Sequence, residues 1–172
     1  MKILAQVSKY LFQYRTAIAV IFFIVLVFFA KPITSTIAHV LVFIGLAVRI
    51  WAAGYIGPAA RKNEFTAEYV ISSGPYRFLK HPLYIGNFFL VLGVLLLYNP
   101  PLWLTVLYIA LFVIIYTLIA LGERRYLQDK VPREVAYKFS NLKGELSTLL
   151  MLFLIYVVYF ILIVFASRRG SF

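Results

Sequence analysis

Cysteine is absent from the 172 residues, and histidine occurs only twice, as His39 and His81. Without cysteine the chain has no disulfide, no thiolate nucleophile and no cysteine-bound metal. Two histidines do not make a histidine-rich metal site by themselves. The sequence therefore predicts a protein without a metal centre.

Charge is also scarce. Charged residues make up 13% of the chain and apolar residues 63%, whereas soluble domains have about 25% charged and roughly 45–50% apolar residues. A globule of this length has too little interior to bury so much apolar surface. An ordinary soluble domain and a disordered chain are both excluded, which leaves an integral membrane protein.

Five apolar runs are read as membrane helices. They cover residues 16–30, 33–56, 82–98, 102–121 and 146–167. The first could be a signal peptide, but Ala30-Lys31-Pro32 offers no small-residue cleavage site, so we expect a retained helix. Asn99-Pro100-Pro101 is a short turn that makes the third and fourth runs an antiparallel hairpin. The sequence predicts an all-α, polytopic membrane bundle of about five helices, forming a single domain over residues 1–172.

Basic residues give the bundle an orientation. The chain has 17 lysines and arginines, and 13 of them lie on the cytoplasmic side if the N-terminus is cytoplasmic. Such clusters between apolar runs fit a membrane lipid as partner better than nucleic acid. The polar segments 57–81 and 122–145 then share the cytoplasmic mouth of the bundle. Arg168-Arg169 does not fit this orientation, because it would follow the fifth run on the outer side. Either the pair is tolerated there, or the fifth run does not cross the membrane.

The densest polar stretch, residues 72–87, leads into the third run. Gly74-Pro75 indicates a turn, and Pro82 suits the first helical position, which makes His81 the N-cap. Helix N-terminal amides with Arg77 nearby attract an anionic group, and Gly86 lets a neighbour approach the backbone. The alternative is an interfacial belt, because tyrosine, lysine, arginine and histidine gather at headgroup level in membrane proteins.

The order of these residues resembles a family signature. Gly74-Pro75-Tyr76-Arg77 followed by His81-Pro82-Leu83-Tyr84-Ile85-Gly86-Asn87 is similar to the GPYR-x-x-RHPxYxG signature of the isoprenylcysteine carboxyl methyltransferase family, to which phospholipid methyltransferases are related. Lys80 replaces the arginine before His-Pro. Glu123-Arg124-Arg125-Tyr126-Leu127 resembles the second family element, EExxL, with Arg124 in place of the second acid. The resemblance implies a small helical bundle that binds S-adenosylmethionine at its mouth.

The resemblance also assigns roles to individual residues. It implies that the cofactor is bound by Tyr76, His81, Pro82, Tyr84, Gly86 and Glu123. It implies that catalysis involves Arg77, His81 and Glu123. We expect the substrate to be bound by Arg49 and Asn87.

Two charged residues have a physical case of their own. Glu123, at the end of the fourth run, can accept hydrogen bonds from an α-ammonium or from ribose hydroxyls. Alternatively, Glu123 is a surface residue paired with Arg124 or Arg125, and such an exposed ion pair contributes little to stability. Arg49 lies within a span, where a cation is costly. It can clamp a lipid phosphate or carboxylate, but we favour snorkelling to the interface or a structural role.

Methyl transfer from a sulfonium requires in-line placement and exclusion of water, and it needs no metal. A carboxylate or thiolate acceptor requires no base, whereas an amine or hydroxyl requires one, for which His81 and Glu123 are the candidates. We expect methyl transfer to a lipid or lipid-linked acceptor that resembles an isoprenylcysteine carboxylate. One alternative is phospholipid amine N-methylation. Another is a non-catalytic membrane subunit with a protein partner, which the replaced second acid favours.

The two arms of the hairpin have similar lengths, so its ends reach a similar depth. We therefore expect Arg77, His81, Tyr84 and Glu123 to line one cavity of order 300 Å³ or more.

The shared cytoplasmic face can be tested directly, because the chain contains no native cysteine. Single cysteines in place of Lys62 and Asn141 should react with a membrane-impermeant maleimide from the same, cytoplasmic side. Labelling from opposite sides would disprove the topology and the common mouth.

Overall fold

The computed structural model describes residues 2–56 and 69–168, with side chains from residue 6 onward. In chain order the elements are α1 (Lys2–Phe28), α2 (Thr36–Ile56), β1 (Val70–Ile71), the 3₁₀ helix η2 (Gly74–Arg77), α3 (Pro82–Tyr98), α4 (Leu102–Leu127), β2 (Pro132–Arg133), the 3₁₀ helix η3 (Phe139–Glu145) and α5 (Leu146–Arg168). The five α-helices confirm the expected all-α bundle. Arg61 and Lys62, which contribute to the orientation argument, lie outside the described residues.

Within the described part of the chain, four helical segments are long and apolar enough to cross a membrane. They are Gln6–Phe28, Thr36–Ile56, Leu102–Leu127 and Phe139–Arg168. α3 has only 17 residues, which gives ~26 Å of helix against a hydrocarbon core of about 30 Å. The first span begins before residue 16, because residues 6–14 contain one charge and continue the helix. The expected boundary at Arg15 is therefore wrong, and Arg15 lies inside α1.

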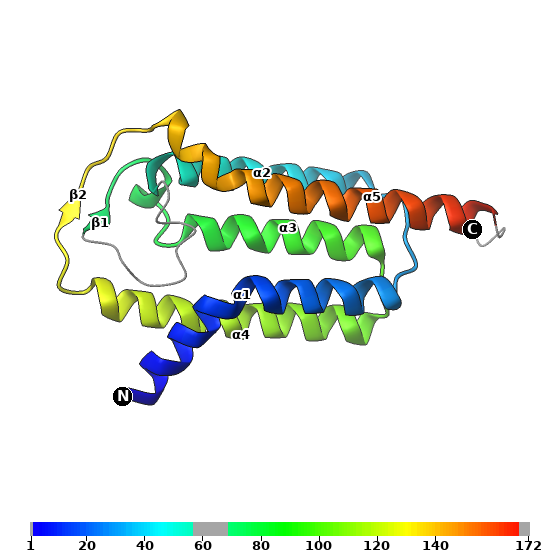
Figure 1. The fold of residues 1–172 in the computed structure, drawn as a ribbon, viewed down its shortest axis with the longest axis horizontal. Helices are drawn as coiled ribbons and strands as arrows, with labels where there is room; N and C mark the ends of the chain where they lie inside the picture. Colours follow the sequence, from blue (N-terminus) through cyan, green and yellow to red (C-terminus); the bar gives the residue numbers. More distant parts are fainter. Residues whose placement is uncertain (1, 57–68, 169–172) are drawn as a thin grey trace.

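The helices alternate in direction and form two groups (Figure 1). α1 packs along α4, and α2 packs along α3. The turn at Asn99, in a left-handed conformation with φ 43°, reverses the chain between α3 and α4 as expected. α3 nevertheless packs mainly against α2, and α4 packs mainly against α1, so the two helices of the hairpin touch each other little. The hairpin therefore leaves space between its arms.

Small residues allow α2 and α3 to pack closely. A Cβ atom on Gly45 would lie 2.7 Å from the carbonyl oxygen of Gly86, and a Cβ on Gly93 would lie 2.8 Å from that of Ala38. Such glycines let two membrane helices approach backbone to backbone, where dispersion contacts hold them together. The α2–α3 pair is thus a tightly packed unit within the bundle.

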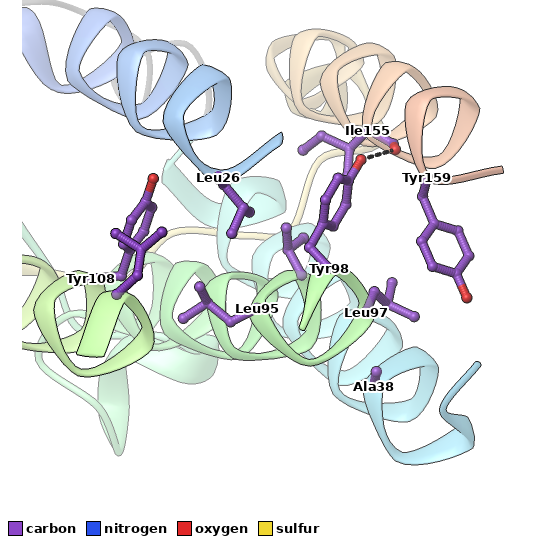
Figure 2. Close-up of a cluster of buried hydrophobic side chains, with 10 residues drawn as sticks. Leu26, Ala38, Leu95, Leu97, Tyr98, Tyr108, Ile155 and Tyr159 are labelled. Atoms are coloured by element: carbon purple, nitrogen blue, oxygen red, sulfur yellow. Dashed lines mark hydrogen bonds between the residues drawn. The ribbon is translucent and has the colours of Figure 1, made fainter. Parts of the chain in front are cut away.

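A cluster of buried side chains closes the end of the bundle at which α3 turns into α4 (Figure 2). The Tyr98 hydroxyl donates to the carbonyl oxygen of Ile155 at 2.6 Å, and the Tyr108 hydroxyl donates to that of Phe22. Water cannot satisfy such hydroxyls inside a bilayer, so backbone carbonyls take its place. These bonds tie α3 to α5 and α4 to α1.

The opposite end, called the polar end below, contains the start of α1 and the described parts of the two polar segments, residues 69–81 and 122–145 (Figure 1). β1 and β2 pair in parallel and join the two segments. Ser73 Oγ donates to the carbonyl of Val135 at 2.7 Å and accepts from the amide of Val135 at 3.0 Å. Asn141 Nδ2 donates to the carbonyl of Gly54 at 2.8 Å. Residues 69–81 and 122–145 therefore pack together at the polar end.

Candidate functional site

A cavity of about 640 Å³ lies inside the bundle, between the two helix groups. Toward the polar end it is lined by Arg15, Arg49, Tyr76, Lys80, His81, Tyr84, Asn87, Tyr116, Glu123 and Thr148. Toward the closed end it is lined by Leu26, Val91, Val94, Leu95, Leu152 and Ile155. It thus combines a polar compartment with an apolar one. Its volume lies in the range of pockets that hold small molecules, about 300–1,000 Å³.

Glu123 accepts two hydrogen bonds at the mouth of this cavity. Nδ1 of His81 lies 3.0 Å from Glu123 Oε2, and the hydroxyl of Tyr84 donates to the same oxygen at 2.9 Å. The rings of His81 and Tyr84 are stacked, with centroids 5.1 Å apart and planes at 9°. Because Nδ1–H donates to the carboxylate, Nε2 is the nitrogen of neutral His81 that can accept a proton.

Local sequence explains how His81 and Tyr84 reach Glu123. His81 is the N-cap residue of α3 and Pro82 its first residue, as the sequence predicts. The His81 side chain makes no capping hydrogen bond, so its ring can turn toward α4. Tyr84 follows in the first turn of α3. The two rings therefore approach Glu123 from one short segment.

Two oxygen atoms at the mouth have unused hydrogen-bonding capacity. Both contacts of Glu123 involve Oε2, and Oε1 has no hydrogen-bond partner within residues 6–56 and 69–168. The hydroxyl of Tyr76 is buried and has no partner among the same residues. Burial and the nearby Glu123 carboxylate raise the pKa of Tyr76, so its hydroxyl stays protonated at neutral pH. A buried polar atom without a partner, such as the Tyr76 hydroxyl, indicates a polar ligand.

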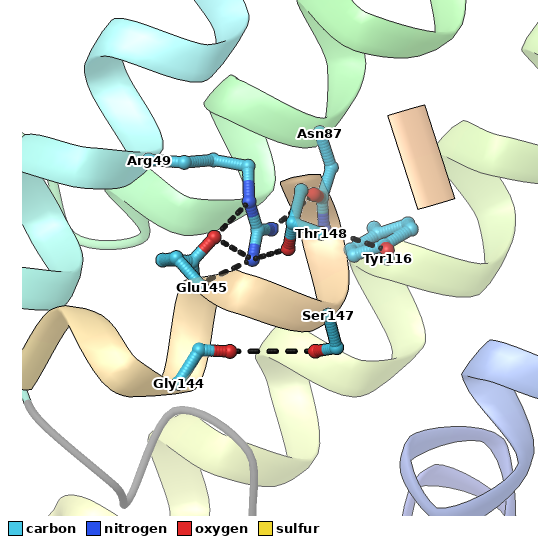
Figure 3. A network of polar contacts seen from close by, with 7 residues as sticks. All are labelled: Arg49, Asn87, Tyr116, Gly144, Glu145, Ser147 and Thr148. Carbon is cyan, nitrogen blue, oxygen red and sulfur yellow. Dashed lines mark hydrogen bonds and ion pairs between the residues drawn. The ribbon is translucent and has the colours of Figure 1, made fainter. Parts of the chain in front are cut away.

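Arg49 is the centre of a second, buried network (Figure 3). Its Nε and Nη2 donate to the two carboxylate oxygens of Glu145, each at 2.9 Å. Nη2 also donates to Thr148 Oγ1 at 3.2 Å, and Nη1 donates to Asn87 Oδ1. Arg49 is 7% exposed and Glu145 1%. The expectation that Arg49 snorkels is wrong, because its charge is buried and neutralised by Glu145. Its expected role in substrate binding stays a prediction.

Tyr116 connects the two networks. Asn87 Nδ2 donates to the Tyr116 hydroxyl at 2.9 Å. The ring of Tyr116 meets that of Tyr84 edge to face, with centroids 5.0 Å apart. Side chains from α2, α3, α4 and α5 are thus joined from Glu145 to Glu123 across the polar compartment.

The charged side chains that line the cavity are mostly cationic. Within the described residues they are Arg15, Arg49, Lys80 and Glu123. Since Glu145 neutralises Arg49, Arg15 and Lys80 give the mouth its positive potential, and Glu123 gives it one negative point. This arrangement suits a ligand that carries charges of both signs.

Seven of the residues assigned from the sequence line the cavity: Arg49, Tyr76, His81, Pro82, Tyr84, Asn87 and Glu123. Two do not. Arg77 ends η2 with an exposed side chain. Gly86 faces α2, where a Cβ would lie 2.6 Å from Arg49 Cγ. The neighbour that Gly86 admits is therefore a helix, not a cofactor. The surface alternative for Glu123 is not what the structure shows, because its carboxylate contacts His81 and Tyr84 rather than Arg124 or Arg125.

The sequence reasoning missed Glu145, Tyr116 and Arg15. Glu145 directly precedes the last apolar run and is one of only six acidic residues, so it could have been considered as the partner of Arg49. Tyr116 had no signal, because it is one of 13 tyrosines. Arg15 was left outside the first apolar run, which was expected to begin at residue 16.

Comparisons with known proteins agree with this architecture. The family described as phospholipid methyltransferase matches residues 33–131. The cobalt-zinc-cadmium resistance protein CzcN of Cupriavidus metallidurans is 29% identical over 107 residues, which are 62% of this chain and 46% of that protein. The chain therefore spans about half the length of this relative. No solved structure gives a significant match.

The Arg49–Glu145 pair yields a prediction about stability. Arg49→Met should lower the free energy of unfolding by ~3–5 kcal/mol, because it leaves the Glu145 charge buried and unpaired. The double variant Arg49→Met/Glu145→Leu should lose less, because neither charge remains. Reversible unfolding in mixed detergent micelles measures both. A double variant that is less stable than Arg49→Met would contradict a mutually neutralising pair.

Proposed function

The chain belongs to the phospholipid methyltransferase family, and on this premise we propose that it transfers a methyl group from S-adenosylmethionine to a lipid or lipid-linked acceptor. The family consists of membrane methyltransferases, and the four long apolar helices make the chain an integral membrane protein. The observation that carries the proposal is the two-part cavity, which joins a polar mouth to an apolar interior.

The polar compartment suits S-adenosylmethionine, which supplies the methyl group and carries a carboxylate, an ammonium and a sulfonium. Glu123 Oε1 is the natural partner for the ammonium, and Lys80 and Arg15 suit the carboxylate. Tyr76 offers a buried hydroxyl to a ribose or adenine. The faces of Tyr84 and Tyr116 can attract a cation such as a sulfonium.

The apolar compartment suits the hydrocarbon part of the acceptor. Leu95, Leu152 and Ile155 line it, and the hydrogen-bonded tyrosines close it. The acceptor headgroup would then lie where the two compartments meet, beside Asn87 and Tyr116. Placing both reactants in one cavity lined largely by apolar side chains supplies the orientation and much of the exclusion of water that methyl transfer needs.

Acceptor chemistry decides the role of His81. A carboxylate, as in isoprenylcysteine, reacts without a base. A phospholipid amine loses a proton, and His81 Nε2 can accept it while Glu123 holds Nδ1–H. The family description favours this second acceptor. We place the polar end at the cytoplasm, because S-adenosylmethionine is cytoplasmic and most basic residues flank this end.

Glu123→Gln should weaken binding of S-adenosylhomocysteine about tenfold or more, because a neutral amide replaces a charge-assisted acceptor. Isothermal titration in detergent micelles measures the affinity. Glu134→Gln, which changes an exposed acid in the same polar segment, is the matched control and should leave it unchanged. If the unaltered protein binds no S-adenosylhomocysteine and purifies with a protein partner, the non-catalytic alternative is correct.

A further inference from the structure

A second hollow lies on the outer surface of the bundle, on the side of α2 that faces away from α3. This groove has a volume of about 400 Å³ and is lined by Phe43, Leu46, Ala47, Ile50, Trp51 and Tyr137. The five residues of α2 recur every three or four positions, so they form one stripe of the helix. Phe43 and Trp51 lie ~12 Å apart along this stripe, with the small Ala47 midway between them. None of the groove residues lines the central cavity.

The stripe does not suit a second helix. Membrane helices associate through small residues, which let their backbones approach each other. On α2 the small residues Ala38 and Gly45 lie on the opposite face, against α3. In the groove only Ala47 is small, and the exposed side chains of Phe43 and Trp51 would hold another helix away. A hydrocarbon chain is narrow and flexible enough to lie between such side chains.

Aromatic and basic residues stand at the polar end of the groove. The ring of Tyr137 fills the place that a side chain at Gly54 would take. Lys138 follows directly, with an exposed side chain, and its amide donates to the carbonyl oxygen of Gly54 at 2.9 Å. Lys138 is thereby fixed at the end of α2, beside the groove. Tryptophan and tyrosine are the residues that lie at the headgroup level of membranes, and a lysine there attracts an anionic headgroup.

We propose that this groove binds one acyl chain of an anionic phospholipid, with the lipid phosphate at Lys138. This lipid site lies outside the cavity and does not depend on the proposed methyl transfer. The charge of the polar end favours an anion, because residues 69–81 and 122–145 contain eight lysines and arginines and four acids. Two of those acids are engaged elsewhere, Glu123 with His81 and Glu145 with Arg49.

A lipid in the groove acts on the segment that completes the buried ion pair. Tyr137 forms one wall of the groove, and eight residues later Glu145 binds Arg49. Between them, Asn141 ties the segment to the end of α2 with a hydrogen bond of 2.8 Å. Contacts between the lipid and Tyr137 therefore stabilise the segment that carries Glu145. The groove links the lipid composition of the membrane to the stability of the polar compartment.

The tryptophans allow a direct test, because the chain has only two. Trp51 lines the groove, whereas Trp103 is an exposed residue near the start of α4, at the closed end. Trp103→Phe leaves Trp51 as the single reporter, and Trp51→Phe is the matched control that leaves Trp103. Each variant is reconstituted in phosphatidylcholine bilayers that contain a fraction of phosphatidylglycerol or phosphatidylcholine with brominated acyl chains. Bromine quenches tryptophan fluorescence at short range, so quenching reports which lipid lies beside each ring.

At equal mole fraction, phosphatidylglycerol should quench Trp51 more than phosphatidylcholine does. Its relative affinity should be about fivefold higher, the effect of one lysine near the membrane surface. Trp103 should show no preference. With Trp51 as reporter, Lys138→Gln should remove the preference. Arg124→Gln, which removes an equal charge from an exposed position at the end of α4, should keep it.

Filling the groove gives a second reading that leaves all charges in place. Ala47 is exposed, so Ala47→Phe should fold normally, as circular dichroism can verify, and Trp51 should lose its preference for phosphatidylglycerol. Equal quenching of Trp51 by the two lipids overturns the inference, and so does a preference that survives both Lys138→Gln and Ala47→Phe. If neither lipid quenches Trp51 and the protein crosslinks as a dimer, a second copy covers the groove and the inference is also wrong.

Discussion

The buried ion pair between Arg49 and Glu145 is the constraint on which the polar compartment depends. Removing two charges from water costs several kcal/mol per ion, so the pair persists only with good geometry and further hydrogen bonds. Both conditions are met. The contact with Glu145 is bidentate, and Asn87 and Thr148 accept the further hydrogen bonds that Arg49 donates. The pair joins α2 to the end of η3, directly before α5, and Arg49 also contacts Thr148 on α5 and Asn87 on α3. Three helices that border the cavity are thereby held in register at one depth.

Helix packing explains why space remains beside this pair. Glycines bring α2 and α3 into backbone contact, while α4 packs along α1. The hairpin partners α3 and α4 therefore belong to different packed units, and the cavity lies between these units. At the closed end the two units meet in the buried cluster, where the ring of Phe23 on α1 contacts that of Tyr98 on α3, with centroids 5.6 Å apart. Glu123 reaches His81 and Tyr84 across the gap at the other end, where the mouth forms.

How far the sequence predicted this structure depends on the kind of interaction. Apolar runs and the turn at Asn99 predicted the helices, and the order of residues around His81 predicted the cluster with Glu123. Periodicity and motif both act over short sequence distances. The pairing of Arg49 with Glu145 did not follow from the sequence, because Glu145 lies 96 residues away and meets it only through packing. Gly86 was assigned to the cofactor, whereas it faces α2. The sequence shows only that a glycine has no side chain, and not whether a helix or a ligand packs against it.

The central claim is that the polar compartment holds the methyl donor between η2 and the end of α4. A structure determined with S-adenosylhomocysteine tests it most directly. The account predicts ligand density against Tyr76 and Glu123, with the ligand ammonium within hydrogen-bonding distance of Glu123. It also predicts that the Arg49–Glu145 pair is unchanged beside the ligand. Density outside the bundle, or a Glu123 side chain turned to solvent with packed side chains filling the cavity, would contradict the account.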